Sequence, residues 1–234
     1  HYQAILQTSR VELFYMGSLD AQTVARCMQR VLKDLPRAEQ FTPVSTTPAP
    51  KARAVTEKIE RLDVTQGKLG LGFFTDITAK DPRYPALVLC STVFGGGATS
   101  KLFTNVREQM SLCYYASSSY EKFKGVMIVS SGVEFSKLET AKQEILRQLD
   151  ACRNGEITDY ELESARGYLL SDLKIAMDSP GRLDDFYMGQ ILLESSGTMR
   201  SLADAIARVT KEEVAQAARE LRLDTIYELQ GVTA

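Results

Sequence analysis

The chain has 234 residues, of which 44% are hydrophobic, and its formal net charge is −2. That length and apolar content suffice for one large domain, or for one domain with a piece of another. Acidic and basic residues are intermixed, which argues against a nucleic-acid-binding surface with a clustered excess of Lys and Arg. No apolar run reaches the roughly 18 residues of a membrane span. We therefore expect neither a nucleic acid nor a membrane as a partner.

The cysteines and the single histidine limit the chemistry that the chain can perform. The four cysteines include no Cys-x-x-Cys pair, so neither a zinc knuckle nor a disulfide framework is predicted. Their spacing favours a reduced, cytoplasmic setting. The only histidine is His1, and a nucleophilic thiol needs a basic partner such as histidine. Cys113 is therefore interpreted as a packing residue, and no metal site is predicted in this chain.

The first 35 residues have the pattern of the end of a folded unit. His1–Gln7 is typical of the tail of a helix without a preceding cap, and Val11–Gly17 is predicted to be a strand closed by glycine. Asp20–Leu35 carries apolar residues at helical spacing, and Pro36 ends this helix. The chain is therefore expected to begin inside a domain.

Residues 36–56 separate this segment from the rest of the chain. They are rich in Pro, Thr and Ala, which predicts an extended linker. The strands Val11–Gly17 and Thr225–Gly231 both follow a helix and end at glycine, as two homologous halves would. We expect residues 1–35 to be the last helix, strand and helix of a preceding domain, and residues 57–234 to be a complete second domain.

Local patterns predict the elements of this second domain. Strands are predicted at 58–64, 67–74, 112–120, 125–133 and 225–231. Helices are predicted from Asp81, from Thr99 to Met110, from the capping boxes Ser136/Glu139, Thr158/Glu161 and Thr210/Glu213, and from Pro180. The result is an α+β fold.

Two groups of residues could be mistaken for catalytic features. Gly95–Gly97 lacks the Gly-Lys-(Ser/Thr) ending of a phosphate-binding loop, so a tight turn with positive φ between two helices is favoured over an anion site. Glu108 with Glu134, and Glu161 with Glu163, could act as paired carboxylates. Solvated helix faces and caps are the favoured interpretation, because the predicted capping boxes already account for several of them.

The most specific feature is the stretch from Phe94 to Tyr115. It reads Phe-Gly-Gly-Gly-Ala-Thr-Ser-Lys-Leu-Phe, followed by Arg107-Glu108 and, after a short turn, by Leu-Cys-Tyr114. It resembles the C-terminal domain of the zinc metallopeptidases that include pitrilysin, insulin-degrading enzyme and the mitochondrial processing peptidases. That family has a Gly-Gly-x-x-Ser-(Arg/Lys)-Leu-(Phe/Tyr) helix start, an Arg-Glu dipeptide and a Leu-(Ala/Cys)-Tyr strand start. The family's metal motif, His-x-x-Glu-His, is absent from these 234 residues.

The resemblance implies a fold and a pair of site residues. The family is built from homologous α/β domains, so we expect a two-layer α/β sandwich with a mostly antiparallel sheet covered by helices. In active members an N-terminal domain holds zinc through two His and a Glu. An Arg and a Tyr of the C-terminal domain bind the substrate backbone and help to stabilise the oxyanion. These two map to Arg107 and Tyr114, and no catalytic residue is expected in this segment.

Two functions follow from the resemblance. The first is the non-zinc-binding half of a pitrilysin-type peptidase, which forms one wall of the substrate chamber and has the missing N-terminal domain and a peptide as partners. The alternative is a non-catalytic sister subunit that binds an active homologue in a homo- or hetero-dimer. The residues that would discriminate the two lie before His1, so whether the parent is an enzyme stays open. An unrelated two-layer α/β domain is a third alternative, which the motif disfavours.

Overall fold

The computed structural model describes residues 1–38 and 54–232. Its sheet has the strand order β1-β5-β2-β4-β3. The strands are β1 (Thr56–Leu62), β2 (Gly67–Phe74), β3 (Cys113–Glu121), β4 (Val126–Val133) and β5 (Arg222–Gly231). β1 and β5 are parallel, and the other neighbouring pairs are antiparallel. The predicted α+β fold with a mostly antiparallel sheet is confirmed.

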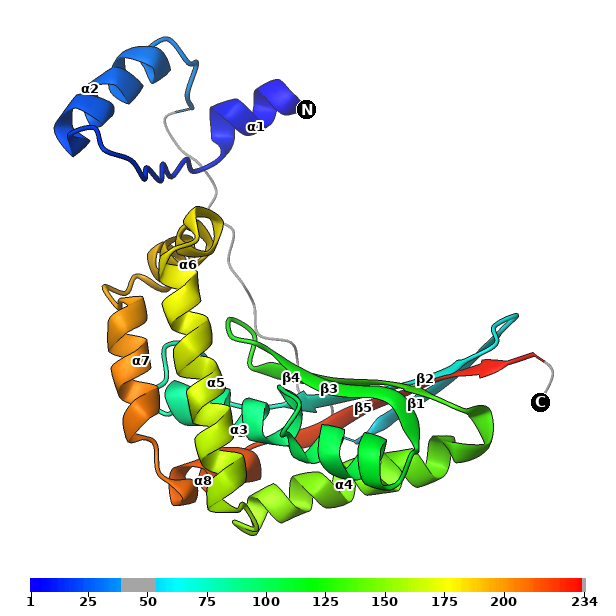
Figure 1. Cartoon of the computed structure of the whole chain (residues 1–234). Coiled ribbons are helices and arrows are strands. Elements are labelled where there is room, and N and C mark those ends of the chain that lie inside the picture. The colour runs from blue at the N-terminus through cyan, green and yellow to red at the C-terminus, as the bar shows by residue number, and fades with distance from the viewer. Residues whose placement is uncertain (39–53, 233–234) are drawn as a thin grey trace.

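Helices cover one face of the sheet and continue beyond one end of it (Figure 1). The helices of the described residues are α1 (Tyr2–Thr8) and α2 (Ala21–Leu32), which lie apart from the sheet, and α3 (Tyr84–Gly95), α4 (Leu138–Arg153), α5 (Asp159–Met177), α6 (Pro180–Leu193), α7 (Met199–Arg208), α8 (Lys211–Arg219), the π-helix η1 (Leu102–Gln109) and the 3-10 turn η2 (Phe135–Lys137). α4 runs along the sheet, α5 and α7 rise beside it, and α6 lies at the upper end of α5 (Figure 1). Within the described ranges, no helix has both the length and the apolar character needed to cross a bilayer.

Buried and more exposed residues alternate along β2 and β4, which gives the sheet two different faces. Leu69, Leu71 and Phe73 point to the helical layer and are almost completely buried, as are Met127 and Val129 of β4. The residues between them lie on the opposite face, which the ribbon shows without helices over it (Figure 1). Because successive strand residues point to opposite faces, one layer of apolar side chains forms the core and the other face stays open.

Two of the three predicted capping boxes are present. Capping boxes start α5 at Thr158 and α8 at Thr210, as the sequence indicated. The predicted box at Ser136 and Glu139 is wrong, because the 3-10 turn η2 occupies this position and α4 begins only at Leu138. Since Ser136 then lies inside η2 rather than at an N-cap, its hydroxyl is not positioned to cap α4.

The helix α7 was not predicted. It begins after a capping box formed by Thr198 and Ser201 rather than by the usual Glu. Serine in place of glutamate removes the most recognisable part of that signal.

The glycines Gly95–Gly97 lie at the predicted turn between α3 and η1, but none of the three has positive φ, so that part of the expectation was wrong. Among the described glycines, positive φ occurs at Gly125 and Gly155. Gly95 is the last residue of α3, and a Cβ atom on it would approach the backbone nitrogen of Ser118 to 2.7 Å. The absence of a side chain therefore allows α3 to lie directly against β3.

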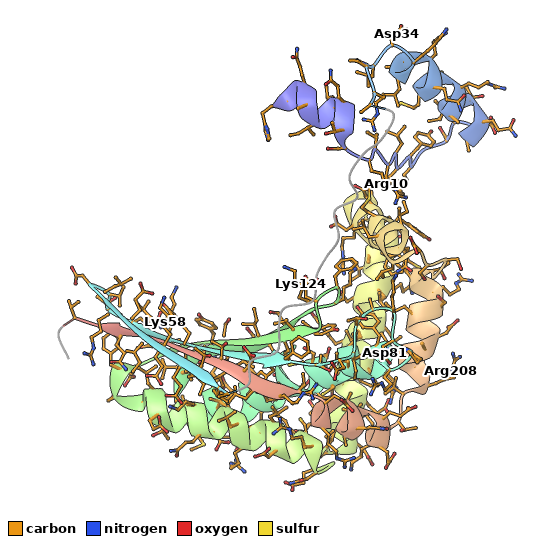
Figure 2. The ribbon with its side chains drawn as sticks, turned by 180° about the vertical axis from the view of Figure 1, so that it is seen from behind. Arg10, Asp34, Lys58, Asp81, Lys124 and Arg208 are labelled. Carbon is orange, nitrogen blue, oxygen red and sulfur yellow. The ribbon has the colours of Figure 1, made fainter. Side chains whose placement is uncertain are left out.

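The segment before the sheet lies beyond α6, away from the strands (Figure 1). From behind, Arg10 and Asp34 are on this segment, far from Lys58 on the sheet (Figure 2). α1 and α2 form as predicted, but 11–16 has no strand structure, so the prediction of a strand at Val11–Gly17 was wrong. A strand needs a hydrogen-bonding neighbour, and the described part of the chain offers none there.

Most of the predicted linker, residues 39–53, lies outside the described residues. The division of the chain into a preceding-domain fragment and a second domain stays a prediction.

Candidate functional site

The Phe94–Tyr115 stretch forms a helix, a turn and the start of an edge strand. A helix was predicted from Thr99 to Met110, and most of it is the π-helix η1. At its end the Met110 amide donates to the Asn105 carbonyl (3.1 Å), and the Leu112 amide donates to the Val106 carbonyl (3.0 Å). π-Helical turns are rare and occur often at functional sites.

The turn after η1 opens onto a hollow of about 380 Å³. Its lining consists of Arg107, Glu108, Ser111, Leu112, Cys113, Tyr114 and Glu134. Ser111 is in the left-handed region with φ of 49°, a backbone conformation that costs a non-glycine residue free energy. The two residues that the motif singled out, Arg107 from η1 and Tyr114 from β3, therefore line one hollow.

Both of these side chains remain accessible. The Arg107 guanidinium lies 4.6 Å from the centre of the Phe103 ring, and its Nε is 3.6 Å from Oε1 of Glu108. Its side chain is still 41% exposed, and Tyr114 is 58% exposed. An ion pair this exposed contributes little free energy. Arg107 can therefore exchange its contact with Glu108 for an acceptor on a bound molecule.

The other groups of the hollow do not provide a nucleophile. Burial raises the pKa of the Cys113 thiol above its usual value, although a hydrogen bond with Ser131 and the charge of Arg107 act in the opposite direction. Cys113 is therefore protonated at neutral pH, in agreement with its interpretation as a packing residue. Glu134 is 3.3 Å from the ammonium group of Lys137, which also donates to the Ser111 carbonyl.

The two carboxylate pairs considered from the sequence have different environments. Glu108 and Glu134 lie on the same hollow, each beside a cation. Glu161 accepts hydrogen bonds from Lys101 and from the Thr158 backbone, and Glu163 pairs with Arg166. The capping interpretation is therefore right for Glu161.

A metal ion such as zinc is held by several ligating side chains that lie close together. In residues 1–38 and 54–232, no three His, Cys, Asp or Glu side chains lie close enough together to share one.

Comparison with known proteins gives the same family as the motif. The model of the peptidase M16 inactive domain matches residues 1–169. The chain is 33% identical over 230 residues to the probable inactive metalloprotease YmfF of Bacillus subtilis, covering 98% of this chain and 54% of that protein. It is 26% identical over 170 residues to the uncharacterized zinc protease YmxG of the same organism, covering 71% of this chain and 41% of that protein.

Solved structures show the same fold. A conserved protein from Enterococcus faecalis V583 superposes with a TM-score of 0.89 and 31% identity, over 100% of this chain and 55% of that one. A peptidase M16 inactive domain from Pseudomonas fluorescens superposes with a TM-score of 0.77 and 17% identity, over 92% of this chain and 52% of that one. The chain spans about half the length of the curated relatives that it matches.

The resemblance inferred from Gly95 to Tyr115 is thus confirmed by matches that extend far beyond this stretch. The chain belongs to the family of peptidase M16 inactive domains.

Proposed function

We propose that this inactive domain forms one wall of a peptide-binding chamber in a longer protein, and that Arg107 and Tyr114 bind the backbone of the peptide there. The observation that carries the proposal is the shared hollow. Two donor side chains from different elements line it, and both stay exposed. The other wall would be a preceding domain, since the relatives are about twice as long as this chain.

The chemistry of the two side chains suits peptide carbonyl groups. The guanidinium of Arg107 is always charged and presents several N–H donors in a plane. The Tyr114 hydroxyl adds a neutral donor. Phe103 lies below the guanidinium and limits its movement without using its hydrogen-bonding capacity. If both donors reach one carbonyl oxygen, they bind it more strongly when negative charge develops on it.

Two versions of this function are compatible with the site. In a peptidase, a catalytic centre outside this chain would cleave the bound peptide, and the pair would also stabilise the oxyanion. In a non-catalytic subunit, the same pair would hold a peptide or a segment of an active partner. The match to a relative named as a probable inactive metalloprotease favours the second version. The proposal includes a homo- or hetero-dimer with a homologous subunit and a cytoplasmic setting.

Peptide binding tests both versions with the same variant. In the natural full-length protein, Arg107→Ala should weaken the binding of a fluorescein-labelled mixed-sequence peptide pool, since it removes the charged donor. If the protein hydrolyses the pool, kcat/KM should fall roughly a hundredfold, the scale of one lost oxyanion donor.

The matched control for this variant is Arg182→Ala on α6. Arg182 is also half-exposed, and it forms an ion pair with Asp172 away from the hollow. Equal binding and equal rates for the two variants would overturn the proposal.

A further inference from the structure

Three rows of side chains on the helix before the hollow have different surroundings. Leu102 and Val106 are completely buried in the core. Phe103 and Arg107 contact each other at the exposed side. The remaining row, formed by Lys101 and Asn105, makes polar contacts with the helices behind η1. Residues four apart lie on the same helix face, so the two side chains of each row have similar surroundings.

The first polar contact joins the start of η1 to α5. The Lys101 ammonium group lies 2.9 Å from Oε1 of Glu161. Their side chains are only 7% and 16% exposed, so the pair is shielded from water and from salt. Glu161 also accepts a hydrogen bond from the Thr158 backbone amide at 2.8 Å. The carboxylate is therefore fixed by the cap of α5 and in turn fixes Lys101.

The second polar contact joins the middle of η1 to α4. The Asn105 side-chain amide donates to Oε1 of Gln148 at 2.9 Å. Gln148 is 3% exposed and donates to Glu144 at 2.6 Å, while Arg147 donates to both oxygens of that carboxylate. These hydrogen bonds with Glu144 fix the orientation of the Gln148 amide. Asn105 consequently has one position in which its bond is satisfied.

We infer that Lys101 and Asn105 are positioning residues, which hold η1 in the π-helical register that brings Arg107 to the hollow. Packing of Leu102 and Val106 keeps one side of η1 in the core, but apolar contact is less directional than hydrogen bonding and does not by itself select the π-helical over the α-helical register. The two polar bonds have fixed partners on α5 and α4, so they select one register. The role of this register in peptide binding rests on the function proposed above for Arg107.

The proposal is tested in the natural full-length protein with Lys101→Met, Lys101→Arg and Asn105→Ala. Amide hydrogen exchange over residues 102–112 should accelerate about tenfold or more in Lys101→Met and Asn105→Ala, and return toward the original rate in Lys101→Arg. Asn105→Ala keeps the test decisive if Lys101→Met does not fold, because it leaves the buried ion pair intact. Unchanged exchange in this segment would overturn the proposal.

A matched control separates positioning from a general loss of stability. Arg166, also on α5, pairs with Glu163 and has a side chain that is 13% exposed, but it donates to carbonyl groups at the end of α7. Arg166→Met should leave exchange over residues 102–112 unchanged relative to the other helices. Equal acceleration in this control and in Asn105→Ala would reduce the Lys101 and Asn105 bonds to ordinary stabilising contacts.

Binding of the fluorescein-labelled peptide pool then links the register to the site. Asn105→Ala should weaken binding, and Arg107→Ala should weaken it much less in the Asn105→Ala background than in the original protein, since both changes remove the same contact. Fully additive effects would contradict positioning. If Arg107→Ala alone leaves binding unchanged, the proposed function fails, while the exchange data still decide whether Lys101 and Asn105 hold the register.

Discussion

α2 and α3 are both helices of 12 residues, yet their surroundings are opposite. α3 is apolar on nearly all sides and buries most of its residues between the sheet, α5 and α8. α2 is amphipathic and buries none. Met28 and Val31, on its apolar stripe, are 41% and 68% exposed. An amphipathic helix normally packs its apolar side against another element, so α2 has the sequence of a packed helix without the packing.

The uncovered side of α2 also forms a hollow of about 660 Å³ with Leu13 and Tyr15. We propose that a preceding domain covers this side, in keeping with the interpretation of residues 1–35 as the end of such a domain. The described residues therefore bury most of α3, whereas none of them covers the apolar side of α2.

The largest effect is expected from Gly95→Ala in α3. The added methyl group would lie 2.7 Å from the Ser118 nitrogen and 2.8 Å from Cδ1 of Leu102, so α3 must move away from β3. We expect a loss of about 3 kcal/mol in the free energy of unfolding, measured by urea denaturation. Gly97→Ala, which meets no atom within 4 Å, is the control and should change it by less than about 0.5 kcal/mol. Similar losses for both would show that α3 is not tightly packed.

A pH-dependent effect is expected at the start of α3. Burial, and to a smaller extent the charge of Glu121, raises the pKa of Tyr84 to about 12. Because the folded-state pKa is the higher one, the stability from neutral Tyr84 is complete below the pKa of the unfolded chain, about 10, and is lost as the pH rises toward 12. Tyr84→Phe should therefore flatten the alkaline fall in the free energy of unfolding. An identical alkaline profile would mean that Tyr84 is not buried.

A smaller effect is expected from two helix caps of the same kind. Thr158 caps α5 by accepting from the Glu161 amide, and Asp20 caps α2 by accepting from the Thr23 amide at 2.9 Å. Thr158→Ala should lower the free energy of unfolding by about 1 kcal/mol. Asp20→Ala should only increase hydrogen exchange within α2, because this helix does not contribute to the core. A global loss from Asp20→Ala would place α2 inside the cooperative unit.

The smallest effect in the isolated chain is expected from Met28→Lys. Met28 is exposed there, so the free energy of unfolding should change by less than about 0.5 kcal/mol. In the natural full-length protein, the same change should cost about 2 kcal/mol or more if a preceding domain covers this side. Equal effects in both forms, measured by urea denaturation, would contradict a covered α2.

Much of the fold could be predicted because local signals and tertiary structure agree. The strands of the sheet and the helices with Thr–Glu capping boxes follow from alternation and cap chemistry. The strand expected at Val11–Gly17 did not form, because alternation gives a strand only where a neighbouring strand pairs with it. α7 was missed because its capping box uses Ser201 in place of glutamate.

The candidate site was predictable only through the resemblance. Arg107 and Tyr114 were identified by the motif, and their shared hollow agrees with that mapping without testing their role. The π-helical form of η1, the left-handed Ser111 and the contacts of Lys101 and Asn105 were not predicted. They depend on partners such as Glu161 and Gln148, which lie far along the sequence and carry no local signal.

The proposed peptide site is tested most directly by locating a bound peptide on the natural full-length protein. A mixed-sequence peptide pool carrying a benzophenone group is photo-crosslinked to it, and the adducts are mapped by mass spectrometry. If Arg107 and Tyr114 bind peptide, adducts should form within residues 107–114, decrease strongly in Arg107→Ala and persist in Arg182→Ala. Adducts confined to the outer surfaces of α4 and α6, with none at the hollow, would contradict the claim that Arg107 and Tyr114 bind peptide.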